Sequence, residues 1–116
     1  MCKLCVFAGT TEGRELVEFL AGQNARVYAC VATEYGQTLL PPFPNVTVSA
    51  ARLTQPEMEA LFQKEQFQLV IDATHPYAAA VTENIVAACA ATGTEYHRLL
   101  RADVASAGEA VYVEHI

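Results

Sequence analysis

Two short polar segments of this sequence carry residue types suited to binding a charged ligand. The first is Gly9-Thr10-Thr11, which leads from an apolar run into a helical pattern. A helix N-terminus attracts anions through its N–H groups and its dipole, and glycine lets the backbone approach them closely. The segment has neither the lysine of a P-loop nor the spacing of G-x-G-x-x-G. It indicates a phosphate-binding turn with two hydroxyl donors, and a threonine-capped glycine turn is the alternative.

The second segment, residues 72–77, brings a carboxylate, a hydroxyl and an imidazole together after another apolar run. A residue before proline is held extended, so His75 is expected to project from the strand end. On the alternative interpretation, Pro76 begins the next helix and Thr74 or His75 caps it. Asp72 is then only a strand-end carboxylate. The density of polar groups favours contact with a ligand.

Three more charged residues lie where a ligand of these segments would pass. An acid about 20 residues after a glycine turn often binds a ribose 2′-hydroxyl, and Glu34 suits that role, although a solvated loop glutamate fits equally well. Arg98 and Arg101 are two of only seven basic residues, and they end the fifth apolar run beside the expected crevice. His97 lies inside that run and is interpreted as structural.

The four cysteines, at positions 2, 5, 30 and 89, are interpreted as buried structural thiols. Cys2 and Cys5 have a C-x-x-C spacing, but they lie in a strand-like run, where such positions face opposite sides. The run offers no helix N-terminus to lower a thiol pKa. No second Cys/His pair follows at zinc spacing, so no metal site is expected.

Alternating apolar runs and amphipathic stretches must position these segments. Strands are expected at 2–8, 26–32, 46–49, 68–73 and 95–100, with the start of a sixth at 110–113. Helices are expected at 11–22, at 54–66 and at 76–92. Thr54 and Glu57 form a capping box with Pro56 in the first turn, and Gly93 ends the last helix.

Strand–helix alternation predicts a parallel sheet with right-handed crossovers and helices on both faces. The simplest arrangement is a Rossmann-like α/β/α sandwich, with five or six parallel strands in the order 3-2-1-4-5. Ligands of such sheets bind at the carboxyl ends of the strands where the winding direction reverses, here between the first and fourth strands. Both polar segments follow those two strands. Residues 1–101 are expected to form this domain, and 102–116 a connecting segment.

Composition excludes several classes of partner. The chain has 116 residues, 53% of them apolar, and a formal net charge of −6. Nucleic-acid and anionic membrane surfaces require a basic patch, so neither is an expected partner. No apolar run reaches the length of a membrane span, and the N-terminus does not resemble a secretory signal. A cytoplasmic location is expected.

Four segments together closely resemble the precorrin-6A reductase family, including its cobalt-precorrin-6A form. They are FAGTTEGREL (7–16), VATEYGQTLL (31–40), VIDATHPYAAAVTENIVAACAATG (70–93) and YHRLLR (96–101). The resemblance implies NADPH or NADH as cofactor and hydride transfer to a double bond of a corrinoid macrocycle in cobalamin biosynthesis. The implied substrate is a small tetrapyrrole.

Site residues are carried over by position from this resemblance. The implied cofactor contacts are Gly9, Thr10, Thr11, Arg14, Thr33, Tyr35, Asp72 and Thr74. The implied substrate contacts are His75, Pro76, Tyr77, Arg98 and Arg101, and His75 and Tyr77 are the candidates for protonation chemistry. Gly13 stands where alanine is more familiar, and Ala102 where the family usually has proline.

The family also has a second α/β domain, with the active site between the two domains. The resemblance therefore implies that 102–116 leads toward a domain absent from this chain and that the chain alone folds without catalysing. The apolar run 110–116 would then lack its natural neighbour, which favours self-association through this segment, for example as a homodimer. The alternative is a non-catalytic nucleotide- or tetrapyrrole-binding module on the same fold. A short-chain dehydrogenase is disfavoured because the sequence has no Tyr-x-x-x-Lys pair.

Overall fold

The computed structural model describes the chain except for residues 1, 32–42, 51, 76–77, 102–110 and 116, and except for the side chains of 100–101 and 111–115. Its elements in chain order are β1 (Cys2–Phe7), α1 (Thr11–Ala21), β2 (Ala25–Cys30), β3 (Val46–Ser49), α3 (Gln55–Glu65), β4 (Leu69–Asp72), α4 (Ala79–Thr92), β5 (Tyr96–Arg101) and β6 (Val111–His115). No helix in these described parts is long and apolar enough to cross a bilayer.

The sheet has the order β3-β2-β1-β4-β5-β6, and its first five strands are parallel. The expected Rossmann-like α/β fold with strand order 3-2-1-4-5 is confirmed. The expectation of a parallel sixth strand is wrong, because β6 is antiparallel to β5. The connection, residues 102–110, is shorter than the dozen or so residues that a parallel crossover needs.

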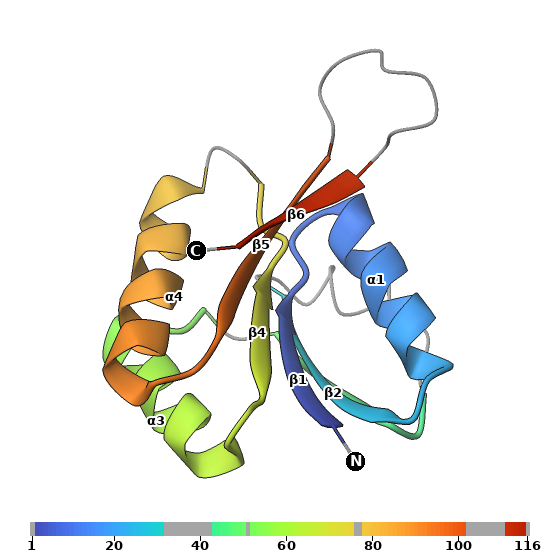
Figure 1. Cartoon of the computed structure of the whole chain (residues 1–116), viewed down its shortest axis with the longest axis horizontal. Coiled ribbons are helices and arrows are strands. Elements are labelled where there is room, and N and C mark those ends of the chain that lie inside the picture. The colour runs from blue at the N-terminus through green and yellow to red at the C-terminus, as the bar shows by residue number, and fades with distance from the viewer. Residues whose placement is uncertain (1, 32–42, 51, 76–77, 102–110, 116) are drawn as a thin grey trace.

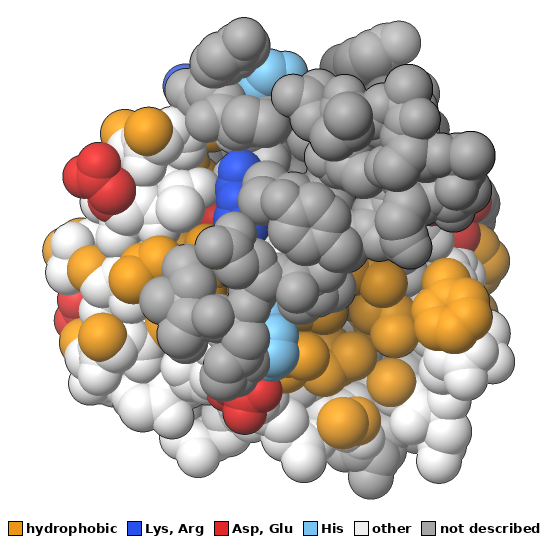
Figure 2. Space-filling model, turned by 45° about the horizontal axis from the view of Figure 1, so that its top comes forward, with side chains coloured by type: hydrophobic (Ala, Val, Ile, Leu, Met, Phe, Trp, Pro, Cys, Tyr) orange, Lys and Arg blue, Asp and Glu red, His pale blue; other side chains and the backbone are white. Residues whose placement is uncertain are grey.

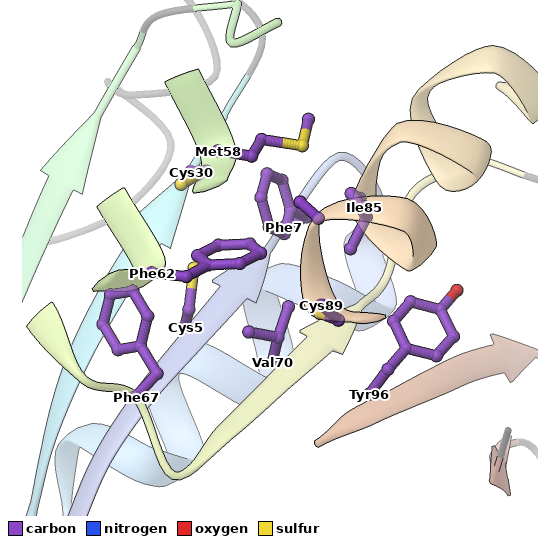
Figure 3. Close-up of a cluster of buried hydrophobic side chains, with 11 residues drawn as sticks. Cys5, Phe7, Cys30, Met58, Phe62, Phe67, Val70, Ile85, Cys89 and Tyr96 are labelled. Carbon is purple, nitrogen blue, oxygen red and sulfur yellow. The ribbon is translucent and has the colours of Figure 1, made fainter. Parts of the chain in front are cut away.

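Helices cover both faces of the sheet, with α1 on one side and α3 and α4 on the other (Figure 1). Alternate residues of β1 point to opposite faces, so Cys5 and Phe7 join one core and Val6 joins the other. The core under α3 and α4 contains most of the buried aromatic rings and is centred on Phe62 (Figure 3). The core under α1 consists mainly of valine, alanine and leucine and includes Val17.

Three helix ends lie where side-chain signals in the sequence predicted them. Thr10 caps α1, Thr54 and Glu57 form the expected capping box of α3, and Gly93 ends α4 in the left-handed region at φ 69°. The start of α4 was predicted wrongly: it begins at Ala79 rather than Pro76. The N–H of Ala78, the residue before the helix, donates to the carbonyl of His75 at 2.8 Å.

Three of the four cysteines are buried, and Cys2 is exposed, so the expectation of a buried thiol was wrong at that position. The alternation of β1 explains the difference, since Cys2 begins the strand at its exposed end. Burial raises the pKa of Cys5 well above its ordinary value. Burial, with the nearby charge of Asp72, raises the pKa of Cys89 to about 12. Cys5 and Cys89 are therefore poor nucleophiles at neutral pH.

We expect a thiol reagent at pH 8 to modify Cys2 of the native chain rapidly. The three buried cysteines should react only after unfolding. The rapid reaction should disappear in Cys2→Ser, which serves as the control. Counting modified thiols by mass spectrometry with and without urea tests this. A second rapidly modified thiol in the native chain would contradict the assigned burial.

Candidate functional site

A pocket of about 510 Å³ opens at the carboxyl edge of the sheet. Its described lining consists of Phe7, Gly9, Cys30, Val31, Arg52, Leu53, Met58, Thr74, His75, Ala78 and Val81. The pocket therefore spans the reversal point between β1 and β4, where open α/β sheets bind ligands. Figure 2 turns this end of the molecule toward the viewer.

The two polar segments singled out in the sequence meet at this pocket. Gly9 and Thr74 both line it, and a Cβ added at Gly9 would lie 3.7 Å from the Cα of Thr74. The turn after β1 and the loop after β4 are thus direct neighbours. His75 is exposed and lines the same pocket, as expected for a side chain that projects from the strand end.

Thr10 acts as the cap of α1 and as a tie between the two segments. Its Oγ1 accepts the N–H of Gly13 at 3.1 Å and donates to the carbonyl of Ala73 at 2.8 Å. The hydroxyl proton is already used, so Thr10 does not offer the phosphate donor that its type suggested. The neighbouring Thr11 is exposed, and its Oγ1 accepts from Nη2 of Arg14 at 3.2 Å. Thr10 therefore acts as the cap of α1. Of the two hydroxyls, that of Thr11 is better placed to contact a phosphate.

Gly13 allows the start of α1 to pack directly on the ends of β1 and β4. A Cβ at this position would lie 2.8 Å from the Cα of Ala8 and 3.0 Å from the Cβ of Ala73. Real Cβ atoms do not approach backbone atoms so closely, so a larger residue would push the helix outward. The glycine thereby fixes the first turn of α1, whose N–H groups lack intrahelical acceptors, against the edge of the pocket.

Asp72 lies at the end of β4 and is fully buried within a polar network. Its Oδ1 accepts the N–H and the hydroxyl of Thr74, at 3.0 and 2.6 Å. Its Oδ2 accepts the hydroxyls of Thr82 and Tyr96, at 2.7 and 2.8 Å. The carboxylate thus joins β4, α4, β5 and the loop after β4. Because no part of Asp72 is exposed, the expected direct contact with a cofactor does not fit, and the residue anchors the pocket loop instead.

Arg98 completes this network from β5. Its Nη1 lies 2.9 Å from Oδ1 of Asp72 and also donates to the hydroxyls of Thr74 and Thr82. Its side chain is 10% exposed, so the guanidinium is mostly committed inside the protein rather than offered to a substrate. The expected pairing of Arg98 with substrate carboxylates is therefore replaced by an internal ion pair.

Hydrogen bonding decides the charge of the network. Burial on its own raises the pKa of Asp72, but hydrogen bonds from the two threonines and from Tyr96 outweigh it, and the pKa lies below its ordinary value. Burial and the hydrogen bond to Asp72 raise the pKa of Tyr96, so its hydroxyl stays a donor. At neutral pH the network holds a carboxylate, a guanidinium and three neutral hydroxyls.

The remaining expected site residues fall into two groups. Thr33, Glu34, Tyr35, Pro76 and Tyr77 lie outside the described residues, as does the side chain of Arg101. His97 lies 2.6 Å from Glu95 through its Nε2 and is half-buried, which agrees with its structural interpretation. Among the described residues, no group of three or more His, Cys, Asp and Glu side chains could hold a metal ion.

Sequence reasoning missed three residues of this region: Arg52, Thr82 and Tyr96. Thr82 and Tyr96 lie inside a helix and a strand, where nothing in the local pattern marks a partner of Asp72. Arg52 could have been found, because it follows β3 and the predicted topology brings the end of that strand to the same edge as Gly9.

Comparison with known proteins adds a consistent set of similarities. The family model "Precorrin-6x reductase CbiJ/CobK" matches residues 3–116. The cobalt-precorrin-6A reductase of Methanothermobacter thermautotrophicus is 35% identical over 85% of this chain and 33% of its own length. The precorrin-6A reductase of Rhodobacter capsulatus is 36% identical over 80% of this chain and 36% of its own length. The solved structure of CobK precorrin-6A reductase matches with a TM-score of 0.76 at 30% identity, covering 93% of this chain and 41% of that one. The chain thus spans about a third of the curated relatives.

Proposed function

Because the chain belongs to the CbiJ/CobK precorrin-6x reductase family, we propose that it is the dinucleotide-binding part of an oxidoreductase of cobalamin biosynthesis. The reaction would transfer a hydride from NADPH or NADH to a C=C bond of a precorrin-6A or cobalt-precorrin-6A macrocycle. One observation supports this assignment most directly. The turn after β1 and the loop after β4 line a single pocket at the reversal point of the sheet.

The described residues suit the two ends of a dinucleotide. The amide-rich first turn of α1, with Gly9 beside it, suits the pyrophosphate. The apolar wall formed by Val31, Leu53 and Met58 suits a flat base. The loop carrying Thr74 and His75 would then lie near the nicotinamide, which supplies the hydride when bound. Thr11 and Arg14 remain candidate phosphate contacts, and Thr33 and Tyr35 remain candidates in the second cofactor loop.

His75 is the described residue best placed to move a proton. Its imidazole is exposed at the pocket, and its two ring nitrogens can donate and accept protons. Asp72 and Arg98 contribute indirectly, because they hold Thr74, the residue before His75, on the end of the sheet. Tyr77 and Pro76 stay proposed substrate contacts, with Tyr77 a second candidate proton donor.

Substrate binding requires cations that this chain supplies sparingly. A corrinoid precursor carries several carboxylates, each of which needs a donor. Since Arg98 is committed to Asp72, Arg101 is the proposed contact from this chain. A second domain of the complete reductase would supply the remaining contacts and the other wall of the site. We propose a cytoplasmic location for this reductase. Self-association would involve β6, whose other edge already pairs with β5.

We expect Gly9→Val to weaken dinucleotide binding at least tenfold while the chain stays folded. A Cβ at Gly9 meets only ordinary contact at 3.7 Å, so the protein tolerates the side chain. The branched side chain would nevertheless occupy the space through which a pyrophosphate approaches the start of α1. Titrating NADPH and NADH into the chain, followed by amide NMR shifts, measures the affinity.

Gly22→Val is the matched control, because Gly22 is exposed at the opposite end of α1. It should leave the affinity unchanged, and thermal unfolding should show both variants within about 1 kcal/mol of the parent chain. Unaltered dinucleotide affinity in folded Gly9→Val would refute the phosphate position.

A further inference from the structure

Arg52 is a cation that lines the pocket and has no role in the dinucleotide site described above. It is exposed, lies three residues after the end of β3, and lines the same pocket as Gly9. Within the described part of the chain, no hydrogen bond or ion pair engages its guanidinium. An arginine held over a pocket without an internal counterion is available to an external anion.

The charge of the pocket contrasts with that of the chain. The sequence has thirteen acidic and seven basic residues. The described lining nevertheless contains Arg52 and His75 and not one aspartate or glutamate. The described lining of this pocket thus sets no carboxylate against a negatively charged ligand, although the protein is acidic.

Strand register sets the spacing between Arg52 and the phosphate turn. Phe7, Cys30 and Ser49 are paired neighbours at the carboxyl ends of β1, β2 and β3. Adjacent strands lie about 4.8 Å apart, so β1 and β3 are separated by about 10 Å. A dinucleotide bound with its pyrophosphate at Gly9 and its adenosine over the end of β2 would place the adenosine ribose between Gly9 and Arg52.

We propose that Arg52 binds a phosphate on the 2′-oxygen of that ribose and makes this pocket selective for NADPH over NADH. The inference rests on the proposed dinucleotide site. The planar guanidinium can donate two hydrogen bonds to one phosphate, and a nearby arginine is the usual device by which such folds accept the 2′-phosphate. Glu34, the residue whose position in the sequence suits a free 2′-hydroxyl, lies outside the described residues, and Arg52 is the charged side chain that the described lining offers near the ribose.

The test compares two fragments that differ only in this phosphate, adenosine 2′,5′-bisphosphate and 5′-AMP, titrated into the chain by NMR. The parent chain should bind the bisphosphate about tenfold or more tightly than AMP, as hydrogen bonds to charged groups predict. Arg52→Gln should lose most of that ratio with little change for AMP, and Arg52→Lys should keep part of it. Arg26→Gln is the matched control, because Arg26 is exposed at the start of β2, at the opposite edge of the sheet.

Each other outcome has a distinct meaning. Equal affinity of the parent chain for both fragments would overturn the inference and leave the dinucleotide site standing. Equal weakening of both fragments by Arg52→Gln would also overturn it, since Arg52 would then contact the shared adenosine, for example by stacking on adenine. If neither fragment nor NADPH or NADH binds at millimolar concentration, the proposed function and this inference fail together.

Discussion

Arg98→Met is expected to lower the free energy of unfolding by about 3–5 kcal/mol, because it leaves a buried carboxylate without its counterion. Asp72 is fully buried, and the guanidinium of Arg98 lies 2.9 Å from it. Methionine fills similar space without charge, so the loss reflects the ion pair rather than a cavity. The same change removes the donors to Thr74 and Thr82 that steady the pocket loop. Urea unfolding followed by circular dichroism measures the loss.

Arg26→Met provides the control, because an exposed arginine should change stability by no more than about 0.5 kcal/mol. The double variant Asp72→Asn with Arg98→Met should lose less than the sum of the two single changes, since it removes both charges. A loss below about 1 kcal/mol in Arg98→Met would show that the pair does not anchor this edge of the sheet.

Acid should weaken the network of Asp72 and Arg98 by protonating the carboxylate. The folded pKa of Asp72 lies below the ordinary value of about 3.9. A carboxylate with a lowered folded pKa stabilises the protein fully above its unfolded pKa and loses that contribution as pH falls through the folded value. Stability should therefore decrease below about pH 4, and Asp72→Asn should show a shallower decrease over that range.

Phe62→Ala is the second change with a large expected effect, a loss of about 3–5 kcal/mol. The ring is 1% exposed and sits at the centre of the core under α3 and α4 (Figure 3). It makes edge-to-face contacts with Phe7 and Phe67, with ring centroids at 6.4 and 6.0 Å. Alanine would remove both contacts and leave a cavity between β1 and α3. Chemical denaturation of the purified variant provides the measurement.

Phe19→Ala is the matched control for this change. Phe19 is 64% exposed on α1, so its removal should alter the free energy of unfolding by at most about 0.5 kcal/mol. Similar losses from the two phenylalanines would contradict the division between the buried and exposed rings.

Local patterns were sufficient to predict most of the fold. Short apolar runs separated by amphipathic stretches specified the five parallel strands and their order, since parallel strands and right-handed crossovers leave few arrangements. Helix ends with side-chain signals were also predictable, as at Thr54 and Gly93. Both depend on residues close together in the chain.

Features that depend on distant partners were not predictable. Asp72 looked like a ligand contact because its partners Thr82, Tyr96 and Arg98 come ten or more residues later in regular elements. Thr74 binds that carboxylate rather than capping a helix, and this explains why α4 begins later than Pro76 suggested. The pocket itself was predictable in position, through the two loops at the reversal point. Predicting that Arg52 lines this pocket would have required the register of β3.

The central position of β1 has a consequence for the order in which the protein assembles during synthesis. β1 is made first, and its Leu4 pairs with Leu69 of β4, which the ribosome adds 65 residues later. At about 5–20 residues per second, one edge of this buried apolar strand waits roughly 3–13 s for its partner. Any sheet of β1, β2 and β3 that forms in this interval leaves one edge of β1 with unpaired N–H and C=O groups. Such an edge can pair with another nascent chain, so slow synthesis of residues 50–72 should favour aggregation.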